Sequence, residues 1–452
     1  MRNKSILLVL IAIVVTVFIS GCSFDDIFGK KKVMVISPFD VKAADVSTNP
    51  VTDIYFDASL SMAGYTTVQN NNFYRQLPDD LMAIGSSIGE TNFYSFGKNV
   101  NQLSGYDYRK FINPDAYVEL ENSIKDVVSS AAPEHLTVIV TDLFETDAAW
   151  SAISSKLQER YFTKKYSVAL IGFKSPFNGI IYDVGLDFAK LPYDSGTDAN
   201  KYRPVYMLVM GPDNYVNDFI KCCQDKQVGN SSLRYVKLSN SLIAGKPADI
   251  SSMDEEDFHN IVPVDDNLLF NDKECAAEYK VDNLQEEVEI VRSFKYIPDQ
   301  YGCKLDFSKI QPKVQVKYVE QAEPEDGEPK AEDENEDLIW KDFNSKNISV
   351  TVVKNEEKSD TYDVHVKFNP TDALNEGTIN GMLIQLVPEV DGLVLPDWVN
   401  QWNIPGYIAS DITAFDGSKT VNLQKTVDTL KNSVLKYGNP TLINMELYFD
   451  LH

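Results

Sequence analysis

The sequence predicts an α/β domain with a doubly wound, mostly parallel sheet of the Rossmann type, followed by a β-rich, sandwich-like region. Strand and helix signals alternate over residues 51–225, which is the pattern of a parallel sheet with helices on both faces. The alternation fades from residue 226, where Val364, Val366 and Phe368 recur with the period of two that marks a half-buried antiparallel strand. We therefore expect two units of different class, over 51–225 and 226–452, in one chain of 452 residues.

Apolar residues at strand and helix spacing predict the elements of the first unit. The expected strands cover residues 51–56, 92–96, 136–141, 166–171 and 205–210. The expected helices cover residues 72–88, 114–128, 150–157 and 215–220, and Pro114 opens the second of them. Residues 173–203 form an insertion between the last two strands, which we expect to be a small packed hairpin; a functional surface loop is the alternative.

Oxygen-bearing side chains gather after the first strand. The strand ends in Asp57, and Ser59 and Ser61 complete an Asp-x-Ser-x-Ser spacing. A later apolar strand ends in Thr141 and Asp142. Carboxylate and hydroxyl oxygens suit a hard divalent ion, and ligands of open α/β sheets collect at the carboxyl ends of strands. The spacing therefore predicts a metal site, and the alternative is that the two serines cap the following helix.

The Asp-x-Ser-x-Ser turn, together with the later strand that ends in Thr-Asp, resembles the metal-ion-dependent adhesion site of von Willebrand factor A (vWA) domains. The resemblance implies Mg²⁺ or Mn²⁺ held directly by Ser59 and Ser61, with Asp57 and Asp142 acting largely through water. The family usually adds a Thr from the intervening loop, and residues 99–120 contain none. Asp115 holds the equivalent place, so either it substitutes as an oxygen ligand or the site is degenerate and empty.

Residues 1–22 predict a bacterial lipoprotein signal peptide. Two basic residues precede an apolar run over 6–19, and small residues follow. The Ile-Ser-Gly-Cys sequence that ends at Cys22 resembles a lipobox, which implies lipidation of Cys22 and anchoring at the extracytoplasmic face of the cell membrane. An uncleaved signal anchor is the alternative, and it also places the protein outside the cytoplasm. Residues 23–50 are expected to form a tether.

The composition of the chain argues against several classes of function. The net charge of −25 argues against nucleic-acid binding, which needs positive charge to neutralise phosphates. The cysteines other than Cys22 allow three pairings, and buried thiols are the expectation: Cys222, Cys223, Cys275 and Cys303. The four histidines are scattered and there is no Cys-x-x-Cys, so neither a zinc site nor a cysteine nucleophile is supported.

The second half contains strand signals around an acidic run. The expected strands cover residues 234–238, 313–319, 348–353, 362–368 and 383–387, and a helix is expected over 423–437. Residues 320–337 carry ten acidic residues and one lysine, so we expect disorder there. The strands at 313–319 and 348–353 would then pair as neighbours across this loop. Trp398 and Trp402 are expected in the core.

These observations favour a binding module. We expect adhesion to an unidentified extracytoplasmic protein whose acidic side chain would complete the coordination of the metal. The alternative is a metal-free structural or assembly component of a cell-envelope complex. A metal-dependent hydrolase is less favoured, because the chain lacks the Asp-x-Asp spacing of aspartyl-phosphate hydrolases and a Gly-x-Ser-x-Gly elbow. We therefore assign no catalytic residue and do not expect an enzyme.

Overall fold

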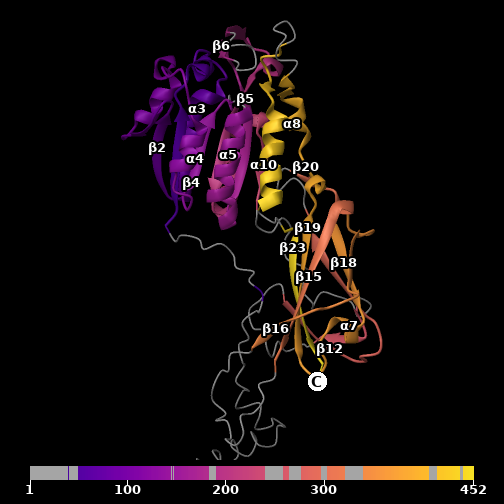
Figure 1. The fold of residues 1–452 in the computed structure, drawn as a ribbon. Coiled ribbons are helices and arrows are strands. Elements are labelled where there is room, and N and C mark those ends of the chain that lie inside the picture. Colours follow the sequence, from indigo (N-terminus) through magenta and orange to yellow (C-terminus); the bar gives the residue numbers. More distant parts are fainter. Residues whose placement is uncertain are drawn as a thin grey trace, which may run out of the picture.

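The computed structural model describes residues 39, 49–143, 145, 147–182, 190–239, 258–263, 276–296, 303–320, 339–406, 415–437 and 441–451. The predicted signal peptide, Cys22, most of the predicted tether and most of the acidic run lie outside these residues. The described chain forms two lobes (Figure 1). We call residues 51–239 with 397–437 the α/β lobe, and residues 258–394 with 441–451 the β lobe.

The α/β lobe is built on a seven-stranded sheet of order β3-β2-β1-β4-β8-β5-β9. Its strands are β1 (Val51–Asp57), β2 (Glu90–Phe96), β3 (Val100–Leu103), β4 (Leu136–Thr141), β5 (Ser167–Ser175), β8 (Arg203–Gly211) and β9 (Arg234–Leu238). Strand β1 pairs in parallel with β2 and β4, whereas β8 runs antiparallel to both β4 and β5. Strands β3 and β9 are also antiparallel to their neighbours. The predicted α/β class is confirmed, but the sheet is mixed and not mostly parallel.

The antiparallel direction of β8 follows from the connection before it. A parallel pair needs a crossover of a dozen or more residues, usually a helix. Between β5 and β8 the described chain instead forms a hairpin of β6 (Asn178–Tyr182) and β7 (Lys190–Asp194), then the 3₁₀ turn η6 (Ala199–Lys201). Since no crossover helix is present in the described part of this connection, β8 returns beside β5. The small hairpin predicted for the insertion is confirmed.

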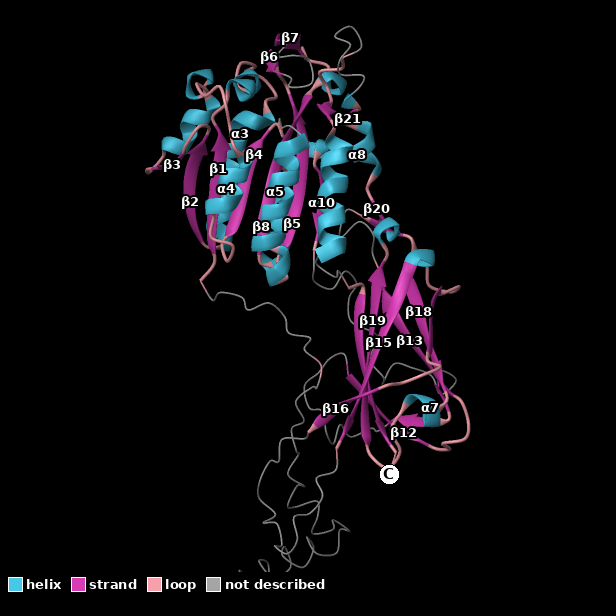
Figure 2. Cartoon of the chain, viewed as in Figure 1, coloured by secondary structure: helices cyan, strands magenta, loops and turns pink. Residues whose placement is uncertain are grey.

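Helices cover both faces of the sheet (Figure 2). Helices α3 (Phe73–Ile88) and α6 (Asp213–Asp225) pack on one face, and α4 (Ile124–Ser130), α5 (Asp147–Arg160) and α10 (Leu423–Tyr437) pack on the other. The central strands are therefore buried on both sides, which explains why their sequences are continuously apolar.

The helix predicted to begin at Pro114 forms in two pieces. Pro114 begins only the 3₁₀ turn η3 (Pro114–Ala116), and α4 starts at Ile124. Between them, Glu119 forms a parallel β-bridge with Ser59, and its backbone exchanges hydrogen bonds of 2.9 and 3.1 Å with the turn after β1. This tertiary pairing holds the segment extended, so the apolar helical spacing of the sequence is overridden there.

The C-terminal part of the chain returns to the α/β lobe. Helix α8 (Asp397–Gln401) packs beside β9, where the Trp398 Nε1–H donates to the Tyr235 carbonyl at 3.3 Å. The Trp402 ring meets the Tyr206 ring at a centroid distance of 6.4 Å. Both tryptophans are buried, as predicted. The α/β lobe therefore includes β9, α8 and α10, all of which lie after residue 225, the predicted end of the first unit.

The β lobe contains a four-stranded sheet of order β10-β13-β18-β17 and a six-stranded sheet of order β11-β12-β23-β19-β15-β16. Their strands are β10 (Phe258–His259), β11 (Ile261–Pro263), β12 (Ala276–Val281), β13 (Val288–Lys295), β15 (Ile310–Val319), β16 (Trp340–Phe343), β17 (Ser349–Lys354), β18 (Thr361–Phe368), β19 (Ile379–Pro388) and β23 (Ile443–Asp450). Phe368 and Phe449 meet edge to face between the sheets, with ring centroids 5.3 Å apart. The expected β-rich, sandwich-like region is therefore present. The described residues also form several short elements, among them β14 (Lys304–Leu305), α7 (Pro370–Ala373), β20 (Leu393–Val394), β21 (Asn403–Ile404) and β22 (Thr420–Val421).

Strand pairing around the acidic run differs from the prediction. Strand β15 pairs with β16, and β17 pairs with β18 in the other sheet, so the predicted pairing of 313–319 with 348–353 is wrong. The reason is that the short strand β16 begins directly after the run and is the nearer partner. The run still connects two paired strands as a hairpin would. Its predicted disorder concerns residues outside the described ones.

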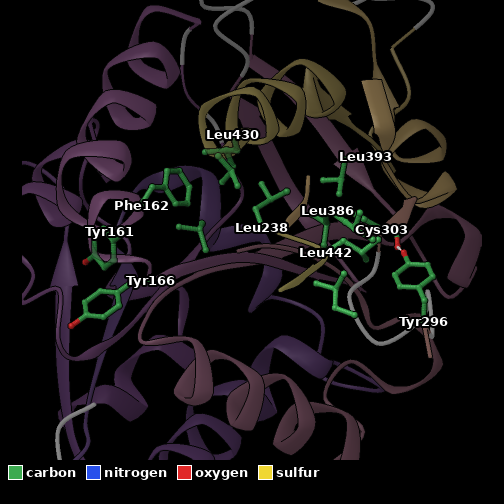
Figure 3. Packing of buried hydrophobic residues seen from close by; sticks show 14 of the residues in the cluster. Tyr161, Phe162, Tyr166, Leu238, Tyr296, Cys303, Leu386, Leu393, Leu430 and Leu442 are labelled. Atoms are coloured by element: carbon green, nitrogen blue, oxygen red, sulfur yellow. Dashed lines mark hydrogen bonds between the residues drawn. The ribbon is translucent and has the colours of Figure 1, made fainter. Parts of the chain in front are cut away.

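One apolar core continues from the α/β lobe into the β lobe (Figure 3). Leu238 of β9 and Leu430 of α10 belong to it, and so do Leu386, Leu442 and Cys303 on the β-lobe side. The cysteines that the structure describes carry free thiols: Cys222, Cys223 and Cys303. Cys223 and Cys303 are buried, as the sequence analysis expects, whereas Cys222 is only half-buried. Cys275 lies outside the described residues.

Candidate functional site

The predicted site begins at Asp57, the last residue of β1. Its carboxylate is buried and accepts three hydrogen bonds. Oδ1 accepts the Ser59 N–H at 2.9 Å, and Oδ2 accepts from Thr141 Oγ1 at 2.9 Å and from Asn122 Nδ2 at 2.5 Å. Because β1 and β4 are parallel neighbours, their carboxyl ends bring Asp57 and Thr141 together, as the spacing predicts.

The two serine hydroxyls lie side by side. Ser59 Oγ and Ser61 Oγ share a hydrogen bond of 3.0 Å, in which either hydroxyl can donate, and both residues are buried. Ser59 occupies the N-cap position of the 3₁₀ helix η1 (Leu60–Tyr65), but its side chain makes no capping hydrogen bond. Ser59 therefore occupies the N-cap position that the alternative predicts, but its hydroxyl is hydrogen-bonded to Ser61 and does not cap the helix.

Asp142 follows β4 and faces a buried cation. Arg203 Nη2 lies 3.9 Å from Asp142 Oδ2, and both side chains are almost fully buried. Arg203 Nη1 also donates to the Gly417 carbonyl at 3.2 Å, and its guanidinium carbon lies 5.6 Å from the centroid of the Phe177 ring. Arg203 begins β8, so a strand that was predicted, but not with its antiparallel direction, supplies a charged residue to the site.

The site is electrostatically acidic. Burial raises the pKa of Asp57 from 3.8 to about 6, and the charge of Asp142 adds to the increase. Burial also raises the pKa of Glu145 from 4.5 to about 7, with further contributions from Asp57 and Asp142. Glu145 accepts the Ile124 N–H at 3.3 Å. Three carboxyl groups that oppose each other's ionisation favour a cation.

The remaining predicted ligand does not join this cluster. Asp115 lies on η3 and is exposed, and Asn122, seven residues later, is the side chain from this connection that contacts Asp57. Asn122, Glu145 and Arg203 were all missed by the sequence analysis. Glu145 could have been recognised as a site residue from the sequence, because it lies only three residues after Asp142, which directly follows β4.

The β6–β7 hairpin supports the loop that carries the serines. The Phe177 ring packs against the Tyr65 ring at a centroid distance of 4.9 Å, and a Cβ on Gly64 would lie 2.4 Å from the Phe177 ring. Thr67 Oγ1 donates to the Asn178 carbonyl at 2.7 Å. The insertion thus fixes the position of η1, and glycine at position 64 makes this approach sterically accessible.

Two large apolar side chains stand exposed beside the site. Val118 and Leu120 are 69% and 84% exposed, and they flank Glu119, which bridges to Ser59.

The donor set can be tested against an octahedral ion. Ligands at right angles around Mg²⁺, each at about 2.0–2.1 Å, are separated by about 3 Å. The 3.0 Å between Ser59 Oγ and Ser61 Oγ matches this separation. Among the described residues, no group of three or more His, Cys, Asp or Glu side chains is arranged to hold a metal ion. A divalent ion would therefore depend on the two hydroxyls, with Asp57 and Asp142 neutralising its charge.

No family model, no curated protein and no solved structure matches the chain. Within the described residues, no helix is long and apolar enough to cross a membrane.

Proposed function

We propose that this chain is a lipid-anchored extracytoplasmic protein whose α/β lobe binds a partner protein through Mg²⁺ or Mn²⁺. The observation that carries the proposal is the pair of serine hydroxyls 3.0 Å apart beside the buried carboxylates of Asp57 and Asp142. The hydroxyls would bind the ion directly, and an acidic side chain of the partner would supply a further oxygen. The exposed Leu120 beside the site would add apolar contact.

We also infer that the lobe is a variant of the vWA fold. Strands β2, β1 and β4 are parallel, and the candidate site lies at the carboxyl ends of β1 and β4, which supports the inference. The antiparallel strands β3, β8 and β9 depart from a doubly wound parallel sheet.

The metal site is tested by thermal unfolding of the full-length chain. Unfolding is followed in EDTA and then in Mg²⁺, Mn²⁺ or Ca²⁺, for the parent, for Asp57→Ala and for the exposed control Asp115→Ala. A ligand that binds only the folded state stabilises it by about 2.7 kcal/mol at a hundredfold excess over Kd. We expect stabilisation of the parent and the control, and none of Asp57→Ala. No stabilisation of the parent by any ion would refute the metal site.

The anchor needs its own test, because Cys22 lies outside the described residues. We expect a radiolabelled fatty acid to be incorporated into the parent and not into Cys22→Ser. Equal labelling of both would exclude lipidation at this cysteine.

A metal-free structural role is the second candidate. It is favoured by Arg203, whose guanidinium already places a positive charge 3.9 Å from Asp142. In that case the partner would bind equally well in EDTA and in Mg²⁺, whereas the metal proposal requires that binding be lost in EDTA.

A further inference from the structure

We infer that Arg203 is an internal cation that competes with a divalent ion for the carboxylates of the site and so sets the metal affinity of the protein. The inference rests on the proposed function, because it takes Ser59 and Ser61 as the place where the ion binds. It assigns Arg203 a role in selecting between a metal-free and a metal-bound site.

The contacts of Arg203 are weak for a buried guanidinium. The residue is 4% exposed, yet its Nη2 lies 3.9 Å from Asp142 Oδ2, where a charge-assisted hydrogen bond would measure about 2.7–2.9 Å. No described residue accepts a hydrogen bond from Nε. A guanidinium carries five N–H donors, and buried charges normally have them paired. Arg203 therefore neutralises Asp142 through its charge and is not locked to it by hydrogen bonds.

Arg203 also has contacts that would keep it in place if Asp142 interacted with a metal ion instead. Its Nη1 donates to the Gly417 carbonyl at 3.2 Å, and the Phe177 ring lies 5.6 Å from the guanidinium carbon. Both contacts are independent of Asp142. The structure thus provides the arginine with a position that does not require the ion pair.

The competition follows from the charges. Asp142 pairs with Arg203, and Asp57 repels Asp142, so a cation in this buried site gains from both carboxylates. A divalent ion and Arg203 would share that attraction while repelling each other, and water screens such repulsion poorly in a buried site. Removal of the arginine charge therefore increases metal affinity.

The test compares Mg²⁺ titrations of the full-length chain by thermal shift. Arg203→Met removes the charge, Arg203→Lys keeps it, and Arg234→Met removes an equal charge from the exposed end of β9. We expect Arg203→Met to lower the Kd for Mg²⁺ at least tenfold. Arg203→Lys and Arg234→Met should stay within threefold of the parent. An unchanged Kd in Arg203→Met, in a parent that responds to Mg²⁺, would overturn the inference and leave the proposed function standing.

A second measurement needs no metal and therefore separates the two claims. A double-mutant cycle of Arg203→Met and Asp142→Asn is measured by urea unfolding in EDTA. We expect the unfolding constants to depart from additivity at least tenfold, because each single change leaves a buried charge uncompensated. Additivity within twofold would overturn the pairing. Non-additivity with no Mg²⁺ response in the parent or in Arg203→Met would refute the metal site, and the competition with it.

Discussion

The clearest prediction concerns the charge of Asp57 in the metal-free protein. The pKa of this carboxyl is raised from 3.8 to about 6, first by burial and then by Asp142. Well below pH 3.8 the carboxyl is protonated in both the folded and the unfolded chain, and its burial carries no cost of ionisation. As the pH rises through 6, the unfolded chain has already lost the proton, and the folded chain must lose it in a buried site. Asp57 therefore destabilises the fold progressively between about pH 4 and pH 6.

The size of the effect follows from the shift. A shift of about 2 pKa units, at about 1.36 kcal/mol per unit, corresponds to about 3 kcal/mol. The substitution Asp57→Asn keeps the shape of the side chain and removes its ionisation. We expect the free energy of unfolding of the parent, minus that of Asp57→Asn, to fall by about 2.5 kcal/mol between pH 4 and pH 7.5 in EDTA, since a small part of the effect is already present at pH 4.

The assay is urea unfolding at a series of pH values, with the exposed Asp115→Asn as the control for loss of one acidic group. The control should follow the parent at every pH. Millimolar Mg²⁺ should abolish the decrease in the parent, because a bound cation favours the ionised carboxylate. A difference between the parent and Asp57→Asn that stays constant from pH 4 to pH 7.5 would refute the reasoning that burial of this charge is costly.

Three further predictions concern buried contacts of the α/β lobe and are measured by urea unfolding in EDTA. Trp402→Ala should lower the free energy of unfolding by about 3–5 kcal/mol, because it empties a buried contact between the C-terminal segment and the first sheet, whereas the exposed Val353→Ala should change it by less than about 0.5 kcal/mol. Asn122→Ala should cost about 1.5–3 kcal/mol, since it removes a hydrogen bond to a buried carboxylate, and a cost near zero would contradict the site geometry. Lys237→Met should cost about 1–3 kcal/mol, because Lys237 Nζ lies 2.6 Å from Asp213 Oδ1 and the lysine is buried, while the carboxylate is a quarter exposed; a neutral result would contradict a stabilising role of this ion pair.

The parts of the fold that the sequence predicts are those set by local patterns. Strand β4 and helix α10 have the predicted bounds, because a run of buried β-branched residues and a helical apolar stripe each need only their own residues to be recognised. The pairing of Asp57 with Thr141 was predictable for the same reason, since both end buried strands that become parallel neighbours.

The parts that could not be predicted depend on contacts between distant residues. The segment around Glu119 has helical spacing but is extended, because it pairs with the turn at Ser59. Strand β9 was predicted as a strand, but its sequence does not indicate that it pairs with β5. Arg203 and Asn122 are single polar residues without a spacing signal, and only the folded chain brings them to the site.

The predicted division of the chain into the units 51–225 and 226–452 does not account for the support of the site, because residues from the second unit pack beside it. Arg203 contacts Gly417, and the Tyr206 hydroxyl shares a hydrogen bond of 2.9 Å with Thr420 Oγ1, so the end of the sheet that carries the site is held by a segment more than two hundred residues later. That segment leads into α10, and the chain then continues to β23 in the middle of the six-stranded sheet. Because α10 and β23 contribute to one continuous apolar core, separation of the lobes would expose buried surface on both. A fragment that ends before α8 would keep most of the β lobe but would lack the contacts of Gly417 and Thr420, helix α10 and strand β23.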